Sequence, residues 1–254
     1  MTAVLYAIPA SHPCAAVEAA LRMKGLAYRR VDLLPVVSRV LQRRRFGRAT
    51  VPAVTFSDGA RVVGSRAILR ELDARVAEPP LLPPEDDPAH DIVERAEAWG
   101  DEVLQPLVRR LIWAALRRRP EAMTSYGSGT RLPIPDPLAR LAAPLVAIAE
   151  QRIHHADDPS VRADLAHLDS HLKRIEGWID DGTLGGEVAN AADLQIAASL
   201  RLLLTLEDVD RRIGDRAAAA LARRWFPDFP GAVPGGALPA AWLRAEGGVA
   251  PPER

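Results

Sequence analysis

The segments LYAIPASHPC at Leu5–Cys14, TVPAV at Thr50–Val54 and GSRAIL at Gly64–Leu69 decide the fold of this chain. The first opens with a short apolar run that predicts a buried strand, and Pro13 then suits the first turn of a helix, where no N–H is needed. The second places Pro52 at the start of another strand, and the third begins a helix directly after a hairpin. Their order predicts an α/β unit at the start of the chain.

Hydrophobic periodicity around these segments predicts the other elements of the N-terminal part. The helix after Ser11 ends at Gly25, and SDGA at Ser57–Ala60 is a hairpin signal between two short strands. The resulting order is β-α-β-α-β-β-α, which we assign to an α/β domain at residues 1–77. The expected strands are Ala3–Ile8, Tyr28–Leu33, Ala53–Phe56 and Arg61–Val63, and the later helices are Pro35–Phe46 and Ser65–Arg75.

The composition changes after this domain. Five prolines fall within Glu78–Pro88, which cannot continue a helix, so residues 78–90 are expected to be a stiff linker. Residues 91–254 are expected to form an all-helical domain with an irregular tail after Gly231. The expected helices are Asp91–Arg119, Leu138–His155, Val161–Asp180, Ala192–Leu206 and Arg216–Phe226, with a loop at Pro120–Asp136.

The bulk composition excludes several classes of protein. With 254 residues and 48% apolar content, the chain can build two domains with a sizeable core. Basic and acidic residues number 33 each, so no long-range field favours nucleic acid or an anionic membrane. No secretory signal or membrane-spanning stretch is present, and one cysteine excludes an intramolecular disulfide and a four-cysteine zinc site. We therefore expect a cytoplasmic protein without a metal.

Taken together, these features resemble the cytosolic glutathione transferase superfamily over roughly residues 3–230. The resemblance implies a thioredoxin-like N-terminal domain, an all-helical C-terminal domain and a site between them. The motif SHPC at Ser11–Cys14 looks like the Ser-x-Pro-Cys pattern of the theta class, in which the serine hydroxyl donates to the glutathione sulfur. The resemblance thus implies that Ser11 is catalytic, that glutathione is the co-substrate and that the protein is a homodimer.

The same resemblance implies which residues hold glutathione. The pair Val51-Pro52 matches the family's cis-proline, whose preceding residue pairs with the cysteinyl backbone of glutathione. Ser65 matches the serine that takes the γ-glutamyl carboxylate at a helix N-terminus. NAAD at Asn190–Asp193 matches the family's buried capping box, and by itself this spacing also predicts a helix start at Ala192.

A hydroxyl at the Ser11 position has a clear chemical use. The thiolate is the nucleophile, and an ordinary cysteine thiol has a pKa near ~8.5. A hydrogen bond to a charged sulfur is worth about 1.5–3 kcal/mol, which lowers the thiol pKa by about 1–2 units. With the positive end of the following helix, Ser11 could keep a bound thiol mostly ionised. The expected partners are a small-molecule thiol and a small hydrophobic electrophile.

Two alternatives remain open at this stage. Gly64 stands where the family usually has an acidic residue for the γ-glutamyl amine, and Thr50 stands where it often has a lysine. Arg66 is a candidate to substitute in part, but Gly64 favours a non-catalytic, thiol-binding protein with the same fold. Cys14 is the alternative catalytic residue, as in a thiol reductase, because the first turn of a helix lowers a thiol pKa. In such reductases, however, the attacking cysteine occupies the Ser11 position.

Overall fold

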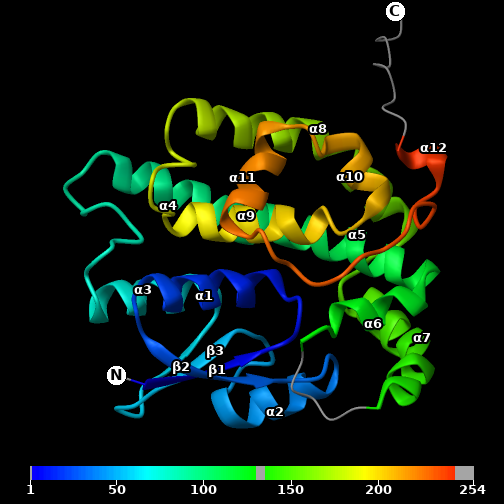
Figure 1. The fold of residues 1–254 in the computed structure, drawn as a ribbon, viewed down its shortest axis with the longest axis horizontal. Coiled ribbons are helices and arrows are strands. Elements are labelled where there is room, and N and C mark those ends of the chain that lie inside the picture. Colours follow the sequence, from blue (N-terminus) through cyan, green and yellow to red (C-terminus); the bar gives the residue numbers. More distant parts are fainter. Residues whose placement is uncertain (1, 130–134, 244–254) are drawn as a thin grey trace, which may run out of the picture.

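The structure is a computed structural model, and it describes residues 2–129 and 135–243. It has two parts that lie one above the other (Figure 1): an N-terminal part that contains the sheet, and a C-terminal part built from helices. The predicted fold class is therefore confirmed. Among the described residues, no helix has both the length and the apolar character that crossing a bilayer requires.

The N-terminal part has the predicted order of elements. They are β1 (Thr2–Ala7), α1 (His12–Met23), β2 (Ala27–Asp32), α2 (Val37–Phe46), β3 (Ala53–Phe56), β4 (Arg61–Val63) and α3 (Ser65–Arg75). The strands form one sheet in the order β2-β1-β3-β4. β1 is parallel to β2 and antiparallel to β3, with Leu5 opposite both Arg30 and Val54. Since β4 is antiparallel to β3, the strands β1, β2 and β4 all end at the same edge, as in a thioredoxin-like domain.

Helices cover both faces of this sheet. α1 and α3 lie between the sheet and the helical part, and α2 lies on the opposite face (Figure 1). Leu5 on β1, Leu21 on α1 and Leu69 on α3 are fully buried. Each such side chain contributes roughly 1.5–3 kcal/mol when it leaves water, so this layer anchors the edge at which α1 and α3 begin.

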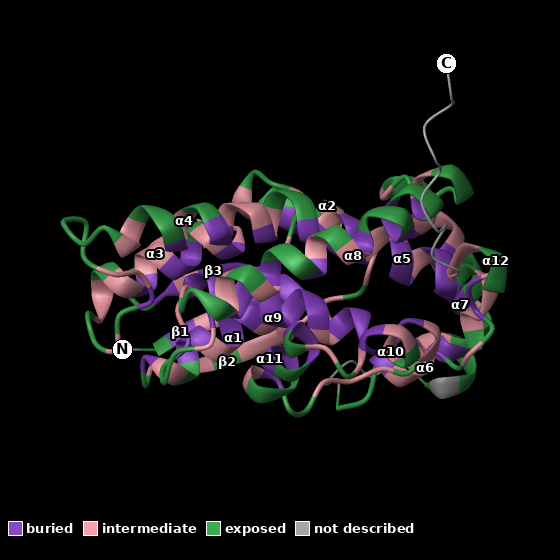
Figure 2. Cartoon of the chain, turned by 90° about the horizontal axis from the view of Figure 1, so that it is seen from above, coloured by how far each residue is buried: buried purple, intermediate pink, exposed green. Residues whose placement is uncertain are grey.

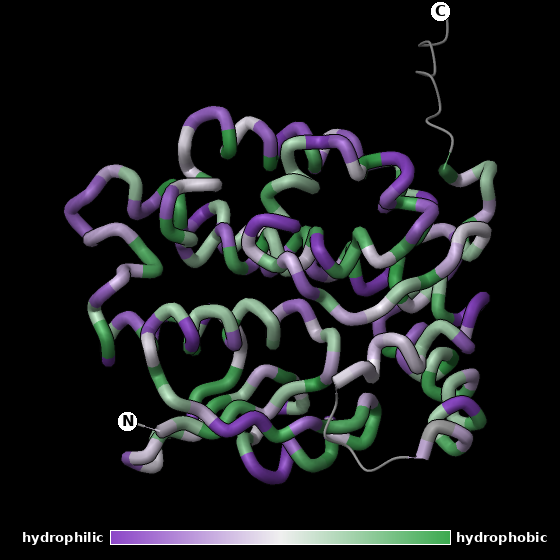
Figure 3. The backbone as a smooth tube through the Cα atoms, viewed as in Figure 1, coloured by the Kyte–Doolittle hydropathy of each residue, from purple (hydrophilic) through white to green (hydrophobic). Residues whose placement is uncertain are grey.

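α2 turns its apolar residues outward. Val37, Val40 and Leu41 are 53%, 56% and 53% exposed. The buried residues of this helix are polar, Ser38 and Gln42, and Figure 3 shows hydrophobic and hydrophilic turns side by side along α2. The predicted helix is confirmed, but its apolar periodicity did not indicate which side faces the sheet.

The proline-rich segment after α3 is held against α1. Lys24 donates from Nζ to the carbonyls of Val76 and Pro79 at 2.6 and 2.5 Å. Its ammonium also pairs with Asp73 at 2.5 Å, and Asp73 accepts from the backbone N–H of Leu81 at 2.9 Å. A buried ammonium needs several such partners, so Lys24 ties the linker to the N-terminal part.

The helical part begins with one continuous rod. Its elements are α4 (Ala89–Trp99), a π-helical turn η1 (Gly100–Leu104), α5 (Gln105–Arg118), η2 (Pro120–Ala122), α6 (Met123–Tyr126), α7 (Asp136–Ile153), α8 (Asp158–Asp180), α9 (Ala191–Leu203), α10 (Glu207–Ile213), α11 (Ala217–Trp225) and α12 (Ala240–Leu243). The helix expected at Asp91–Arg119 corresponds to α4, η1 and α5. Close approach to α9 explains Gly100, where a Cβ would lie 3.0 Å from Ile196 Cγ1.

Three differences from the predicted helical part are local. α9 ends at Leu203 rather than Leu206, because Leu206 instead forms a parallel bridge with Val233. α10, which follows this bridge, was not predicted. The expected loop at Pro120–Asp136 contains η2 and α6, while residues 130–134 lie outside the described residues. Of the expected irregular tail, residues 244–254 also lie outside them.

α9 is the central helix of the molecule and is buried along its length (Figure 2). Its predicted capping box is confirmed: the Asn190 side chain accepts from the Asp193 N–H at 2.9 Å, and the Asp193 carboxylate accepts from the Asn190 N–H at 3.1 Å. Asp193 also accepts from the Gly185 N–H at 2.8 Å and from Trp225 Nε1 at 3.2 Å. This cap fixes the start of α9 and hence the position of every side chain that it turns toward α1 and α3.

Candidate functional site

The sheet topology brings the residues of the three N-terminal segments to one edge. β1 and β4 end there and β3 begins there, so the residues that follow or precede these strands are neighbours. The Gly64 N–H donates to the Pro52 carbonyl at 2.9 Å, which joins the start of β3 to the start of α3. The Val51-Pro52 peptide is cis, as the resemblance implied. Ser11, at the start of α1, follows β1 at the same edge.

Ser11 is the N-cap residue of α1, but its side chain does not cap the helix. Its backbone is extended, with φ −72° and ψ 115°, and no side-chain cap hydrogen bond is formed. Its hydroxyl instead hydrogen-bonds to the Cys14 thiol. The first turn of α1 contains Pro13 and no acidic residue, so its positive end is not neutralised by a side chain of that turn.

Cys14 is a poor nucleophile in this position. It is 1% exposed, and burial raises the pKa of its thiol from 9.0 to about 11, although the hydrogen bond from Ser11 acts in the opposite direction. The thiol is therefore protonated at neutral pH. A buried, protonated cysteine is chemically inert compared with the exposed, low-pKa cysteines of reductases.

A cleft of about 460 Å³ opens beside Ser11 and Cys14. One wall comes from the loop before α1, the outer side of α1 and β2, and the other from chain segments of the helical part. Among its lining residues are Ser128 and Gly129 and the segment Phe226, Asp228, Phe229 and Pro230. The cleft therefore lies between the two parts of the molecule, next to the start of α1.

Charged side chains on the α1 and β2 wall of this cleft are paired with one another. Tyr28 Oη donates to Glu18 Oε1 at 2.7 Å, and Arg22 pairs with Glu18 at 3.1 Å. Arg30 pairs with Glu18 and, at 2.6 Å, with Asp32. Because these charges compensate each other, the wall is polar but largely neutral, and Ser11 is the hydroxyl at its mouth.

Ser65 and Arg66, both named from the sequence, do not line this cleft. Ser65 is 4% exposed, and its Oγ accepts a hydrogen bond from Gln195 Nε2 at 2.8 Å. Arg66 pairs with Glu97 at 3.3 Å and with Glu102 at 3.6 Å, so its guanidinium faces the helical part. The sheet edge thus gathers Ser11, Pro52 and Ser65, while their side chains face different surroundings.

His12, next to Ser11, is buried against α9 and has a defined tautomer. Ser199 Oγ donates to the Gln195 carbonyl at 2.8 Å, so it can only accept from His12 Nδ1, which lies 3.0 Å away. Nε2 is then a bare acceptor, and it has no hydrogen-bond partner among the described residues. Burial lowers the pKa of His12 well below its ordinary value, and the charges of Arg109 and His154 lower it further. The ring is neutral at neutral pH.

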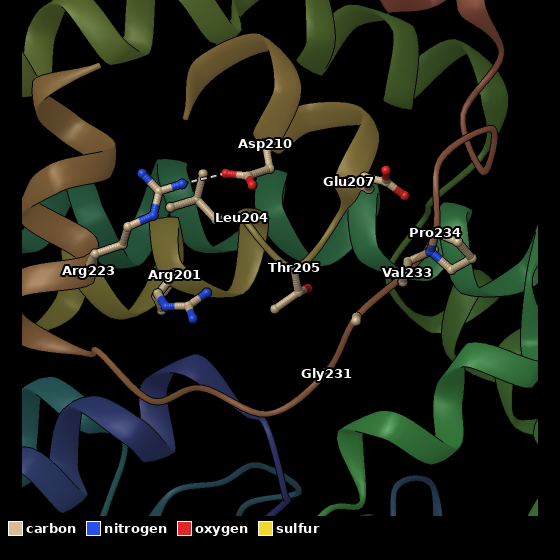
Figure 4. Close-up of a pocket in the computed structure, with 10 residues that line it drawn as sticks. Arg201, Leu204, Thr205, Glu207, Asp210, Arg223, Gly231, Val233 and Pro234 are labelled. Carbon is tan, nitrogen blue, oxygen red and sulfur yellow. Dashed lines mark hydrogen bonds and ion pairs between the residues drawn. The ribbon is translucent and has the colours of Figure 1, made fainter. Parts of the chain in front are cut away.

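A second hollow, of about 510 Å³, lies under the segment that crosses α9 and α10 (Figure 4). Its lining residues are Arg201, Leu204, Thr205, Glu207, Asp210, Arg223, Gly231, Ala232, Val233 and Pro234. Arg223 donates to Asp210 at 2.6 Å, and Arg201 donates to the Phe226 carbonyl at 2.9 Å. Its arginines serve these internal contacts, and it contains none of the residues named from the sequence.

Sequence reasoning missed the polar residues of the helical part that reach this edge. Gln195 and Ser199 lie four residues apart on α9 and contact Ser65 and His12, respectively. The available signal was their polarity within a helix whose other inward residues are apolar. No three His, Cys, Asp or Glu side chains gather at metal-binding distance in residues 2–129 and 135–243.

Comparison with known proteins agrees with this architecture. Residues 5–80 match the profile of a family described as "Glutathione S-transferase, N-terminal domain". A search of curated protein sequences found no significant match. Many solved structures match, at sequence identities low enough that the likeness concerns the fold.

Three of these structures cover most of the chain. A glutathione S-transferase from Rhodospirillum rubrum F11 is 22% identical, with a TM-score of 0.57 over 88% of this chain and 85% of that chain. A glutathione S-transferase from Methylobacterium radiotolerans JCM 2831, in complex with glutathione sulfonate, is 20% identical, with a TM-score of 0.55 over 88% and 90%. FzlA from C. crescentus is 20% identical, with a TM-score of 0.58 over 96% and 98%. Residues 5–80 are thus a glutathione S-transferase N-terminal domain, and the chain as a whole has the fold of the glutathione S-transferase superfamily.

Proposed function

We propose that this protein is a glutathione transferase-like enzyme in which Ser11 activates the thiol of glutathione or of a related thiol. The observation that carries the proposal is the position of Ser11, whose hydroxyl stands at the uncapped start of α1 and lines the cleft between the two parts. The Methylobacterium radiotolerans structure with this fold contains glutathione sulfonate, which supports a glutathione-like ligand.

In the proposed reaction Ser11 acts as a hydrogen-bond donor and not as a nucleophile. Its present partner, the Cys14 thiol, is protonated and therefore a weak acceptor. A charged sulfur is a stronger acceptor, so the hydroxyl would turn to a bound thiolate. The sulfur then forms a C–S bond with a small apolar electrophile, the leaving group departs with its electron pair, and the thiol proton is released to solvent.

The sheet edge would supply the remaining contacts with the thiol ligand. We assign the backbone of Val51, beside the cis-proline Pro52, to the cysteinyl part of the ligand. Ser65 and the N–H groups of the first turn of α3, including that of Arg66, would take a carboxylate. The electrophile would occupy the cleft near Phe229. We further propose a cytoplasmic homodimer.

A calorimetric titration with glutathione, combined with two variants, tests this function. Ser11→Ala should retain binding and lose most conjugation of a chloronitroarene, whereas Cys14→Ala should leave turnover within about twofold, because its thiol is buried and protonated. Equal loss in both variants, or loss only in Cys14→Ala, would show a cysteine-dependent thiol reductase instead.

A non-catalytic thiol-binding protein is the second candidate, and Gly64 is the observation in its favour. Gly64 has a φ of 97°, which L residues rarely adopt, and a Cβ there would meet no atom within 4 Å. The edge therefore lacks an acidic side chain at this position. Glutathione binding without turnover of any of several electrophiles would support this candidate.

A further inference from the structure

A chain of hydrogen bonds connects the helical part to Ser65. Arg109 Nη2 donates to Gln105 Oε1 at 2.5 Å, and Gln105 Nε2 donates to Gln195 Oε1 at 2.9 Å. Gln195 Nε2 then donates to Ser65 Oγ at 2.8 Å. We call Arg109, Gln105, Gln195 and Ser65 the interdomain relay. It joins α5, α9 and α3, which are far apart in the sequence.

Elementary hydrogen-bond chemistry sets the direction of this relay. A guanidinium only donates, so Gln105 must present its amide oxygen to Arg109 and its NH₂ group to Gln195. Gln195 must then present its own oxygen to Gln105 and its NH₂ group to Ser65. Every donor points toward Ser65, and the Ser65 oxygen is an acceptor in this bond. Its own proton is left to point elsewhere, and no acceptor for it is found among the described residues.

The relay is shielded from water along most of its length. Gln105 is 1% exposed, Gln195 is 0% exposed and Ser65 is 4% exposed. Hydrogen bonds in such surroundings polarise one another, so a charge at one end strengthens the donor at the other. The charge here is Arg109, whose guanidinium forms no ion pair within 4.0 Å in the described part of the chain. Asp101 is near enough to raise the pKa of Arg109, but burial has the larger, opposite effect.

We propose that the interdomain relay points the Ser65 proton at a carboxylate of the bound thiol, and that Gln195 is the positioning residue that sets this direction. This inference rests on the proposed function and specifies its ligand as a thiol with a carboxylate at the α3 end. The free N–H groups at the start of α3 favour the same charge. Arg66 and Arg70 already hold the nearby carboxylate of Glu97 at 3.3 and 2.8 Å.

The test compares two ligands that do not need thiol activation. One is S-methylglutathione, and the other is the same peptide with the α-carboxylate of its γ-glutamyl residue replaced by hydrogen. Calorimetry on the full chain should give a preference of about tenfold or more for the first, as expected for a hydrogen bond to a charged group. Gln195→Glu makes position 195 an acceptor, so the Ser65 proton turns away from the ligand, and the preference should fall to about threefold or less.

Two further variants separate positioning from folding. Gln195→Leu removes the donor to Ser65 without adding a charge, and it should also reduce the preference if Gln195→Glu does not fold. Ser199→Ala is the matched control: it lies one turn further along α9 and breaks the bond from His12, but not the relay. It should retain the full preference.

The outcomes separate this inference from the proposed function. Retention of the full preference in a folded Gln195→Glu or Gln195→Leu protein overturns the relay, even if Ser11→Ala abolishes turnover. Unchanged turnover in Ser11→Ala overturns the proposed function, while a preference that depends on Gln195 still supports the relay. Failure of the wild-type protein to bind S-methylglutathione overturns both.

Discussion

Ser11 and Ser65 each stand at the start of a helix on the same edge of the sheet, yet they have different surroundings. Ser11 lines a cleft and bonds with Cys14, three residues away on the same helix. Ser65 is buried and bonds with Gln195, 130 residues away on α9. The comparison teaches that one serine is set by its own helix, while the other is set by the helical part of the molecule. The predictions below separate the two.

Asp193→Ala should give the largest effect, and it should act on the Ser65 side. Asp193 is fully buried and accepts hydrogen bonds from Asn190, Gly185 and Trp225. Its removal leaves buried donors unpaired and loosens the start of α9, two residues before Gln195. We expect a loss of about 3–4 kcal/mol in the free energy of unfolding, measured with urea.

Asp158→Ala is the control for this measurement. Asp158 is 52% exposed in its side chain and pairs with Arg118 at 2.7 Å. An exposed pair of this kind contributes about 0.2–1 kcal/mol. A loss in Asp193→Ala no larger than the loss in Asp158→Ala would show that α9 does not depend on its cap.

The Ser11 side should show a pH dependence of stability that comes from Cys14. Its thiol pKa is about 11 in the folded protein and 9.0 ordinarily, so between these values the unfolded chain releases a proton that the folded chain keeps. Stability is therefore lost as the pH rises through this window, by about 2–3 kcal/mol in total. Unfolding of wild type and Cys14→Ala at both ends of the window measures it. Tyrosine and lysine titration is common to both proteins, so parallel curves would contradict the prediction.

Ser11→Ala should have the next largest effect, and it should be confined to the sulfur. Loss of a hydrogen bond to a thiolate raises the pKa of the bound thiol by about 1–2 units. The ultraviolet absorbance of the thiolate, followed against pH, measures this change, and kcat/KM at neutral pH should fall about tenfold to hundredfold. Ser11→Thr keeps a hydroxyl and should stay close to wild type. An unchanged thiol pKa in Ser11→Ala would remove the proposed role of this residue.

Ser65→Ala should have the smallest effect of the four, and it should be confined to affinity. The ligand loses one donor to its carboxylate, so S-methylglutathione should bind about tenfold more weakly. The pKa of the bound thiol should stay within about 0.3 units of the wild-type value, because the sulfur lies at the other serine. A change in thiol pKa as large as that of Ser11→Ala would mean that the two serines do not act separately.

Much of the architecture was predictable because it follows from local patterns. Pro13 after Ser11, the hairpin at Ser57–Ala60 and the capping box at Asn190–Asp193 are short-range signals, and the structure has a helix, a strand pair and a helix start at these places. α2 shows the limit of such patterns. Its periodicity is helical, but packing against the sheet buries Ser38 and leaves Val40 exposed.

The candidate site divides along the same line. The sequence by itself determined which residues reach the sheet edge, because strand direction and helix starts are encoded within a few residues of Ser11, Pro52 and Ser65. Only the tertiary structure decided what each side chain meets there. Gln195 faces Ser65 because α9 packs over the starts of α1 and α3, and hydrogen-bond direction depends on partners that are distant in the sequence.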